Sequence, residues 1–359
     1  MRNVKVGIIG CGGIANGKHM PALSGLSNVE MVAFCDIIEE RAQDAADKFG
    51  APKARVYKDY QEMLKKEGEM EVVHVLTPNR THSPITVAAL ESGRHVMCEK
   101  PMAKDVDGAR AMVAAAKKTG KKLTIGYQSR CRTDSLYLKQ LCEAGELGEI
   151  YYARAIALRR RAVPTWGVFL DEYEQGGGPL IDIGTHALDL TLWMMNNYEP
   201  MVVLGTSYRK LADTKNAANA WGPWDPAKFT VEDSAFGFIR FKNGATCVLE
   251  SSWALNIAEP KEAITMLCGT KGGADMFDDL RINGEHLGKT WLKKVDTEIG
   301  GVAFFEGAGN KPEDIEAATW ISAVTENTPL RVLPEQALVV TEILDAIYRS
   351  AKTGQAIKM

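Results

Sequence analysis

The chain has 359 residues, a formal net charge of -3 and a charged fraction of 25%. This length exceeds one ordinary domain, so we expect two domains, and the near-neutral charge carries no signal for nucleic acid or for a polybasic membrane contact. No apolar run approaches the ~18 residues of a membrane span. The 7 cysteines form no C-x-x-C pair and no disulfide framework, and the first strand begins too early for a signal peptide. We therefore expect a cytoplasmic protein with no metal site.

The first predicted element is a strand at residues 4–9, which runs directly into the pattern Gly10-x-Gly12-x-x-Ala15. Gly10 allows a tight turn, Gly12 lets the backbone approach a pyrophosphate, and a small side chain at Ala15 lets the next helix pack close to the strand. The helix N-terminus offers N–H groups and a positive dipole end to phosphates. This pattern predicts a dinucleotide site at Gly10, Cys11, Gly12, Gly13 and Ile14.

An acidic residue follows the second predicted strand. Asp36 comes directly after residues 29–35, at the spacing that dinucleotide-binding units show. A carboxylate there accepts hydrogen bonds from both ribose hydroxyls of the adenosine and repels a 2′-phosphate. The next basic residue is Arg41. The sequence therefore favours NAD over NADP. The alternative is a glycine turn and a surface aspartate without a ligand.

Strands and helices alternate through the first third of the chain. We expect strands at 4–9, 29–35, 72–76, 95–98 and 122–126, and helices near 13–26, 39–48, 59–66, 81–92 and 105–118. This alternation predicts a doubly wound parallel sheet in a domain of residues 1–126. Ligands of such sheets bind beyond the carboxyl ends of the strands. That rule indicates the segments 10–14, 77–82 and 99–101.

The pattern changes after about residue 150. Residues 151–158, 231–241 and 245–253 alternate, and Lys242-Asn243-Gly244 is typical of a hairpin turn with two positive φ angles. We expect a mainly antiparallel sheet in an α+β domain of residues 127–359. A helix is expected at 179–195 and two more near 312–325 and 335–352. Long loops are expected at 213–230 and 299–310, as lids or partner contacts.

Lys100 follows the predicted strand at 95–98, in Glu99-Lys100-Pro101. A lysine at the carboxyl end of a parallel strand is placed to polarise a substrate hydroxyl or ketone. Pro101 restricts Lys100 to extended backbone, and the bond between them tolerates the cis form. The alternative is a surface Lys-Pro turn.

The helix that opens at Gly176-Gly177-Gly178-Pro179 carries Asp182, His186 and Asp189 on one face. Burying such groups is costly unless they pair or meet a ligand. Asp182 could fix the tautomer of His186 and raise its basicity. The alternative is an Asp–His pair satisfied inside the core.

Two further features are less specific. Arg159 and Trp166 could line a sugar pocket, although the run Arg159-Arg160-Arg161 also suits a solvated strand end. His82 begins a helix near the expected cofactor site, where it could equally serve as a capping-turn residue.

Six ordered motifs together resemble the Gfo/Idh/MocA family, the glucose–fructose oxidoreductase and inositol dehydrogenase family. They cover nearly the full chain and are GIIGCGGIA at 7–15, Asp36, TPNRTH at 77–82, CEKPMA at 98–103, GGGPLIDIGTHALDL at 176–190 and VEDSAFGFIRFKNGA at 231–245. The resemblance implies a Rossmann domain followed by a mostly antiparallel α/β domain, whose open sheet forms homo-oligomers, either dimers or tetramers.

The resemblance also implies roles for individual residues. The catalytic positions match Lys100, Asp182 and His186. The positions that line the cofactor match Thr77, Pro78, Asn79, His82, Glu99, Lys100 and Gln128. The predicted substrate-binding set is Tyr127, Arg159, Trp166, Asp182 and His186.

The expected activity is hydride transfer between a secondary hydroxyl of a sugar, glycoside or cyclitol and the nicotinamide of NAD. His186 would take the hydroxyl proton, Asp182 would orient His186, and Lys100 would favour the negative charge that develops on the oxygen. The segment 159–167 and the opening glycine loop further resemble oxidoreductases of gut bacteria, which oxidise the sugar 3-hydroxyl of plant glycosides. Two alternatives stay open: a redox-neutral enzyme that retains NAD, and a non-catalytic regulator that senses NAD.

Overall fold

The computed structural model describes residues 2–297 and 311–359. The chain forms two compact units, of which the first comprises residues 2–131 and 311–338 and the second residues 132–297 and 339–359. The sequence predicted a single boundary after residue 126, whereas the chain returns to the first unit near its end. The loop predicted at 299–310 lies outside the described residues.

The first unit contains a six-stranded sheet in which every strand pair is parallel. The strands are β1 (Val4–Ile9), β2 (Val29–Cys35), β3 (Arg55–Tyr57), β4 (Val72–Val75), β5 (His95–Cys98) and β6 (Leu123–Ile125). Their order is β3-β2-β1-β4-β5-β6, so the winding direction reverses between β1 and β4. The prediction of a doubly wound parallel sheet is confirmed. The three-residue edge strand β3 was not predicted.

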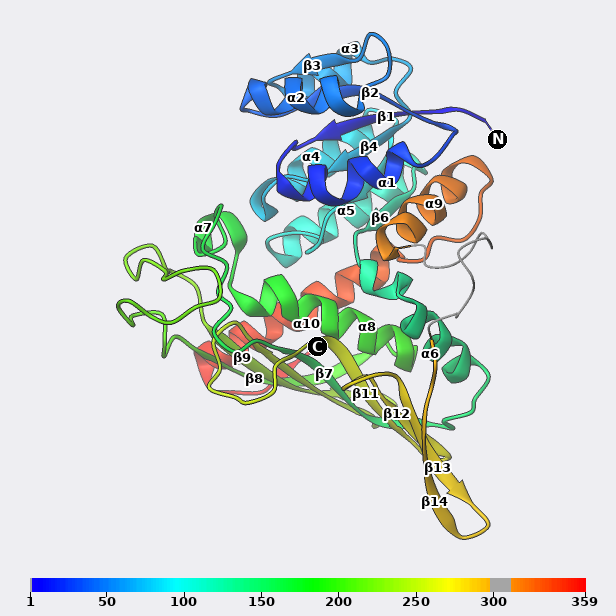
Figure 1. Cartoon of the computed structure of the whole chain (residues 1–359), viewed down its shortest axis with the longest axis vertical. Helices are drawn as coiled ribbons and strands as arrows, with labels where there is room; N and C mark the ends of the chain where they lie inside the picture. Colours follow the sequence, from blue (N-terminus) through cyan, green and yellow to red (C-terminus); the bar gives the residue numbers. More distant parts are fainter. Residues whose placement is uncertain (1, 298–310) are drawn as a thin grey trace. The chain divides into compact units, whose positions relative to one another are not determined.

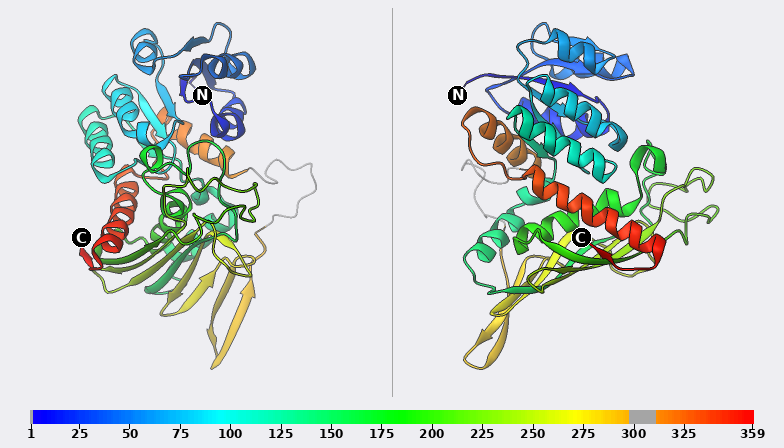
Figure 2. Two further views of the ribbon diagram at one scale, coloured as in Figure 1. Left: turned by 90° about the vertical axis from the view of Figure 1, so that its left-hand side faces the viewer. Right: turned by 180° about the vertical axis from the view of Figure 1, so that it is seen from behind.

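Helices lie on both faces of this sheet, as the left view of Figure 2 shows. They are α1 (Met20–Ser24), α2 (Glu39–Phe49), α3 (Tyr60–Lys66), α4 (Asn79–Glu91) and α5 (Val106–Thr119). Helix α1 contacts α2, and α4 contacts both α3 and α5. The helix predicted at 13–26 contains a π-helical turn, η1 (Ala15–His19), which precedes α1. A short 3-10 helix, η2 (Gln128–Cys131), follows β6.

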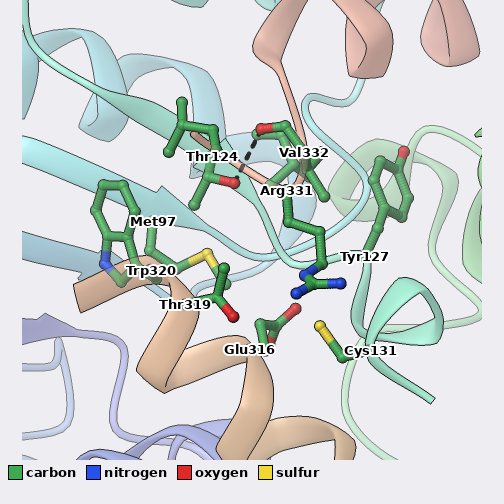
Figure 3. A pocket seen from close by; sticks show the side chains of 11 residues that line it. Met97, Thr124, Tyr127, Cys131, Glu316, Thr319, Trp320, Arg331 and Val332 are labelled. Atoms are coloured by element: carbon green, nitrogen blue, oxygen red, sulfur yellow. Dashed lines mark hydrogen bonds between the residues drawn. The ribbon is translucent and has the colours of Figure 1, made fainter. Parts of the chain in front are cut away.

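Helix α9 (Pro312–Thr325) completes the core of the first unit. Its Ala317, Trp320 and Ile321 are buried in the same apolar cluster as Val4, on β1, and Phe34, on β2. This apolar contact explains why the segment belongs to the first unit although the sequence assigned it to the second. A cavity of about 20 Å³ lies between α9 and strands β5 and β6, and Figure 3 shows the side chains that line it. That volume is about the size of one water molecule.

The second unit contains a nine-stranded sheet in the order β14-β13-β12-β11-β7-β10-β9-β8-β15. Its strands are β7 (Ile150–Leu158), β8 (Pro200–Tyr208), β9 (Ser234–Phe241), β10 (Thr246–Ser252), β11 (Lys261–Gly269), β12 (Gly272–Asp275), β13 (Arg281–His286), β14 (Lys289–Lys294) and β15 (Ile357–Lys358). Among the strand pairs that the described residues form in this sheet, only β7–β10 is parallel. The predicted mainly antiparallel sheet is therefore confirmed.

Helices of the second unit cover one face of this sheet (Figure 1). They are α6 (Thr133–Glu143), α8 (Thr185–Met195), and α10 (Pro334–Thr353), which begins in the first unit. The short α7 (Glu172–Gln175) precedes α8 in the chain and lies away from the sheet. Helix α8 packs on β7 and β11, while Ile347 of α10 lies against Gly205 and Gly237. Among the described residues no helix covers the opposite face, where Leu204 and Phe238 are paired neighbours and both are exposed.

The turn between β9 and β10 differs from its prediction. Phe241 N donates to Ala245 O at 2.9 Å, and Gly244 is the only residue of Lys242-Asn243-Gly244 with a positive φ, +91°. A left-handed glycine after two residues of ordinary turn backbone closes a longer hairpin loop. The predicted turn with two positive φ angles is therefore wrong, although the hairpin itself is present.

Candidate active site

The glycine loop leaves β1 at the point where the strand order reverses. Gly10 has a φ of +93°, and a Cβ atom at this position would lie 2.7 Å from the carbonyl group of Leu76, directly after β4. A side chain cannot fit there, so the two loops approach each other only because Gly10 has none. At Gly12 and Gly13, by contrast, an added Cβ would meet no atom within 4 Å. This open backbone cradle fits the pyrophosphate of a dinucleotide.

Asp36 is held against the glycine loop. Its Oδ2 accepts a hydrogen bond from Cys11 N at 2.9 Å, and its Oδ1 accepts one from Ile38 N at 2.9 Å. An ionised carboxylate has about four lone-pair sites, so two remain for ribose hydroxyls. The bond to Cys11 was not predicted from the sequence, and it fixes the orientation that ribose recognition needs.

His82 ties together the loops that follow β4 and β5. It is buried near the start of α4, with Nε2 2.7 Å from Thr77 O and Nδ1 2.8 Å from Pro101 O. Burial lowers the pKa of His82, so the ring is neutral near pH 7 and only one nitrogen donates. Both ring nitrogens thus face backbone carbonyls of this chain. The Lys100–Pro101 peptide bond is cis.

Glu99 points into the interior of the first unit. Its Oε1 accepts hydrogen bonds from Lys18 Nζ and His19 Nε2, both at 2.8 Å, and its Oε2 accepts one from the backbone N of Lys100 at 2.9 Å. Burial disfavours the charge, but Lys18 and His19 outweigh it and hold the pKa of Glu99 well below its usual range. Glu99 therefore fixes the backbone of Lys100. Lys18 and His19 were not predicted, although both lie directly after the glycine loop.

Lys18 also joins Glu99 to the end of the chain. Its Nζ lies 2.9 Å from Glu316 Oε2 on α9, and both side chains are almost fully buried. The two carboxylates outweigh the effect of burial and raise the pKa of Lys18. The Lys100 loop thus connects through Glu99 and Lys18 to helix α9.

A buried carboxylate also holds the start of the Asp182 segment in the second unit. Glu232 Oε2 accepts from Gly178 N at 2.8 Å, and its Oε1 accepts from Leu180 N at 3.1 Å and Tyr348 OH at 2.8 Å. A Cβ at Gly177 would lie 2.0 Å from Tyr348 OH, and one at Gly178 2.3 Å from Glu232 O. The glycine run therefore lets the chain approach this pair. Burial raises the pKa of Glu232 to about 7, although the three donors favour the anion.

Asp182 lies in a π-helical turn, η3 (Leu180–Gly184), and His186 in the first turn of α8. Both are half-buried, whereas Asp189 is fully buried. Trp253 Nε1 donates to Asp182 Oδ2 at 3.0 Å. The helix predicted at 179–195 is therefore present, but its first turn is π-helical rather than α-helical, and π-helical turns recur at functional sites.

Arg159 follows directly after β7, and Trp166 lies in the loop beyond it. Arg159 donates from Nε and Nη2 to the two carboxylate oxygens of Glu262, each at 2.6 Å. Trp166 is exposed, and so is Arg160, as expected for a solvated strand end. Arg161 Nη2 donates to Asn256 Oδ1 at 2.9 Å.

The remaining predicted residues belong to the first unit. Asn79 is buried at the start of α4, after Pro78, and Gln128 begins η2. Tyr127 is buried and lines the cavity of Figure 3 with Met97 and Cys131. Thus the glycine loop, Asp36 and Lys100 lie in the first unit, and Asp182 and His186 in the second.

We searched residues 2–297 and 311–359 for clusters of metal ligands and for membrane-spanning helices. Within these ranges no group of three His, Cys, Asp or Glu side chains could hold a metal ion. No helix there is long and apolar enough to cross a membrane.

Known proteins resemble the chain over its whole length. Residues 4–127 match the model of an oxidoreductase family with an NAD-binding Rossmann fold, and residues 135–275 match the Gfo/Idh/MocA C-terminal domain. D-glucoside 3-dehydrogenase of Escherichia coli is 37% identical over 356 residues, which cover 99% of this chain and 97% of the relative. Inositol 2-dehydrogenase of Salmonella typhimurium is 32% identical over 194 residues, 54% of this chain and 55% of the relative.

Solved structures agree on the fold. The structure of levoglucosan dehydrogenase in complex with NADH and L-sorbose superposes with a TM-score of 0.84 at 23% identity, and covers 100% of this chain and 99% of that one. A crystal structure of an oxidoreductase domain protein from Kribbella flavida gives a TM-score of 0.85 at 23% identity, with coverage of 100% and 99%. The chain therefore belongs to the Gfo/Idh/MocA family of NAD-binding oxidoreductases.

Proposed function

We propose that the protein is an NAD-dependent dehydrogenase that oxidises a secondary hydroxyl of a sugar, with the 3-hydroxyl of a D-glucoside as the leading candidate. The observation that carries this proposal is the 37% identity to D-glucoside 3-dehydrogenase over 99% of the chain. Inositol 2-dehydrogenase covers only 54% of the chain, so a cyclitol is the second candidate.

The proposed roles follow from the chemistry of three side chains. His186 takes the proton of the reacting hydroxyl, and Asp182 orients His186 and stabilises its charged form. Lys100 donates a hydrogen bond to the same oxygen and favours its developing negative charge. Bound NAD supplies the hydride acceptor.

Two buried carboxylates support these roles. Glu99 accepts the backbone N–H of Lys100, and Glu232 accepts those of Gly178 and Leu180, just before Asp182. Catalytic groups work best when the surrounding structure holds their geometry in advance. A regulator that only senses NAD needs the glycine cradle and Asp36, but has no use for buried carboxylates that hold Lys100 and the segment before Asp182 in place.

The proposal includes release of NADH after each turnover. In the alternative redox-neutral cycle, NAD stays bound while a substrate is oxidised and a ketone is later reduced, and the proton shuttle would serve both directions. Chromatography of nucleotide released from the denatured, purified protein separates the two. Near-stoichiometric bound NAD(H), with sugar turnover that yields no NADH in solution, would favour the retained cofactor.

We also propose a cytoplasmic homo-oligomer. All seven cysteines are without disulfide bonds, which suits a reducing compartment. The uncovered sheet face places Leu204 and Phe238, which are 47% and 49% exposed, side by side. A second copy could bury this apolar pair. Analytical ultracentrifugation of Leu204→Glu should show smaller assemblies than the wild type.

The decisive experiment incubates the pure protein with NAD and a panel of glucosides, free sugars and inositols. Both NADH and the keto product are measured. A 3-keto glucoside formed with equimolar NADH would support the proposal. If no hydroxyl compound yields a ketone at any pH, and a protein partner binds only with NAD, the regulator is the better explanation.

A further inference from the structure

Trp253 lies directly after β10 and is the largest fully buried side chain of the described residues. An indole has one polar group, Nε1–H, and a buried N–H group needs an acceptor. Trp224 is buried as well, and it donates to a backbone carbonyl, Ala212 O, at 2.8 Å. Trp253 instead donates to a side chain, Asp182 Oδ2, at 3.0 Å. The buried indole is therefore paired with a proposed catalytic carboxylate.

Trp253 is held by its backbone and by its ring. Its N donates to Asp233 O at 3.1 Å, and its carbonyl accepts from Ala162 N at 2.8 Å. The indole packs against Phe229, with ring centroids 6.3 Å apart, and Phe229 packs against Trp224 with centroids 5.9 Å apart. A donor fixed in this way has its direction set before any substrate binds.

The same stretch of chain also holds the π-helical turn η3 that carries Asp182. Ser251 Oγ, on β10, donates to Pro179 O at 2.8 Å, directly before η3. An added Cβ at Gly184, the last residue of η3, would lie 3.0 Å from Ser251 Oγ. Residues two positions apart on an extended chain point to the same side. Ser251 therefore fixes the turn itself, while Trp253 fixes the carboxylate that the turn presents.

A neutral N–H donor suits the role proposed for Asp182. That role is to orient His186 and to stabilise its charged form, which requires an ionised carboxylate with a fixed direction. A hydrogen bond to the charged form of a carboxylate favours that form. Unlike a lysine or an arginine, an indole adds no positive charge that would repel a protonated histidine. Trp253 therefore meets both requirements.

We propose that Trp253 is a positioning residue, which holds the carboxylate of Asp182 in the direction that its action on His186 requires. This proposal rests on the proposed dehydrogenase function and deepens it. It adds a residue that acts on the reaction through Asp182.

The kinetic test compares Trp253→Phe with Trp224→Phe. Both variants keep an aromatic ring in the same stack, and each loses one N–H donor, but only Trp253 donates to Asp182. With methyl glucoside as the substrate, Trp253→Phe should lower kcat at least about tenfold, the scale of a hydrogen bond to a charged group, while the KM for NAD stays unchanged. Trp224→Phe should leave kcat within about twofold of the wild type.

A second comparison adds Trp253→Phe to Asp182→Ala. A residue that acts through Asp182 loses its effect once the carboxylate is gone, so kcat of the double variant should stay within about twofold of Asp182→Ala. A further loss as large as in the wild-type background would overturn the proposal, because Trp253 would then act by another route. An unchanged kcat in Trp253→Phe would overturn it as well, and so would an equal loss in Trp224→Phe.

Nuclear magnetic resonance of isotope-labelled tryptophan tests the contact without any turnover. The chain has 7 tryptophans, so few indole N–H signals need to be resolved. One of them should move strongly in Asp182→Ala, and Trp253→Phe should lack that signal. The comparison of wild type and Asp182→Ala needs no change at position 253, so it decides the question even if Trp253→Phe does not fold.

This measurement also separates the proposal from the dehydrogenase proposal. If no indole signal moves in Asp182→Ala, the positioning role of Trp253 is overturned, whatever the protein oxidises. If the signal moves but the wild type oxidises no hydroxyl compound, Trp253 does position Asp182 and the dehydrogenase proposal fails.

Discussion

Glu232 should make the stability of the protein depend on pH. Its carboxyl group has a pKa of about 7 in the folded chain against an ordinary value of 4.5. Between these values the folded chain binds more protons than the unfolded chain. The stability contributed by protonated Glu232 is therefore complete below a pH of about 4.5 and is lost as the pH rises through about 7. The difference corresponds to about 3 kcal/mol of unfolding free energy.

The assay is urea unfolding, followed by circular dichroism at several pH values, of the wild type and Glu232→Gln. The variant cannot titrate at this position. The unfolding free energy of the wild type minus that of the variant should fall by about 3 kcal/mol between roughly pH 4.5 and pH 8. Glu285→Gln, at an exposed position of β13, is the control and should give a flat difference. A flat difference for Glu232→Gln as well would refute the reasoning.

Three other outcomes can be measured directly. NAD should bind at least about tenfold better than NADP in calorimetry, and Asp36→Ala should relax this preference; equal wild-type affinities would contradict the role of Asp36. Lys100→Ala and His186→Ala should each lower kcat at least about a hundredfold, and His186→Ala should change the affinity for NAD much less than Lys100→Ala does. Near-normal turnover in either variant would show that the residue has a structural role only. Gly178→Ala should lower the melting temperature, because the added Cβ would lie 2.3 Å from Glu232 O, whereas Gly17→Ala, which meets no atom within 4 Å, should not.

The features that were predicted correctly are determined by residues that lie close together in the sequence. Gly10 and Asp36 each follow a strand that is easy to recognise from its apolar residues. Because neighbouring parallel strands end at the same edge of a sheet, the sequence places both residues at that edge. The π-helical form of the turn at Asp182 escaped prediction, because an apolar helix pattern does not distinguish a π-helical turn from an α-helical one. The short strand β3 and the polar strand β14 have too few apolar residues to stand out.

Contacts between distant segments escaped prediction for another reason. Lys18 meets Glu99 and Glu316, and Gly178 meets Glu232, across separations that no local pattern encodes. Family resemblance placed Glu99 at the cofactor, but it could not show that Lys18 and His19 bind this side chain in the interior of the first unit. The orientation of a buried carboxylate follows from its charged neighbours, which only the folded structure identifies.

The return of residues 311–338 to the first unit has a consequence for how the chain is made. On the ribosome the parallel sheet is complete once residue 125 has emerged, yet Trp320, which fills its core, is still to be synthesised. At a synthesis rate of about 5–20 residues per second, roughly ten to forty seconds pass between the synthesis of β6 and that of α9. During that interval its apolar face is a target for chaperones. A gene fragment that ends at residue 131 would lack the α9 side chains of this core, so we expect it to be less stable than the complete first unit.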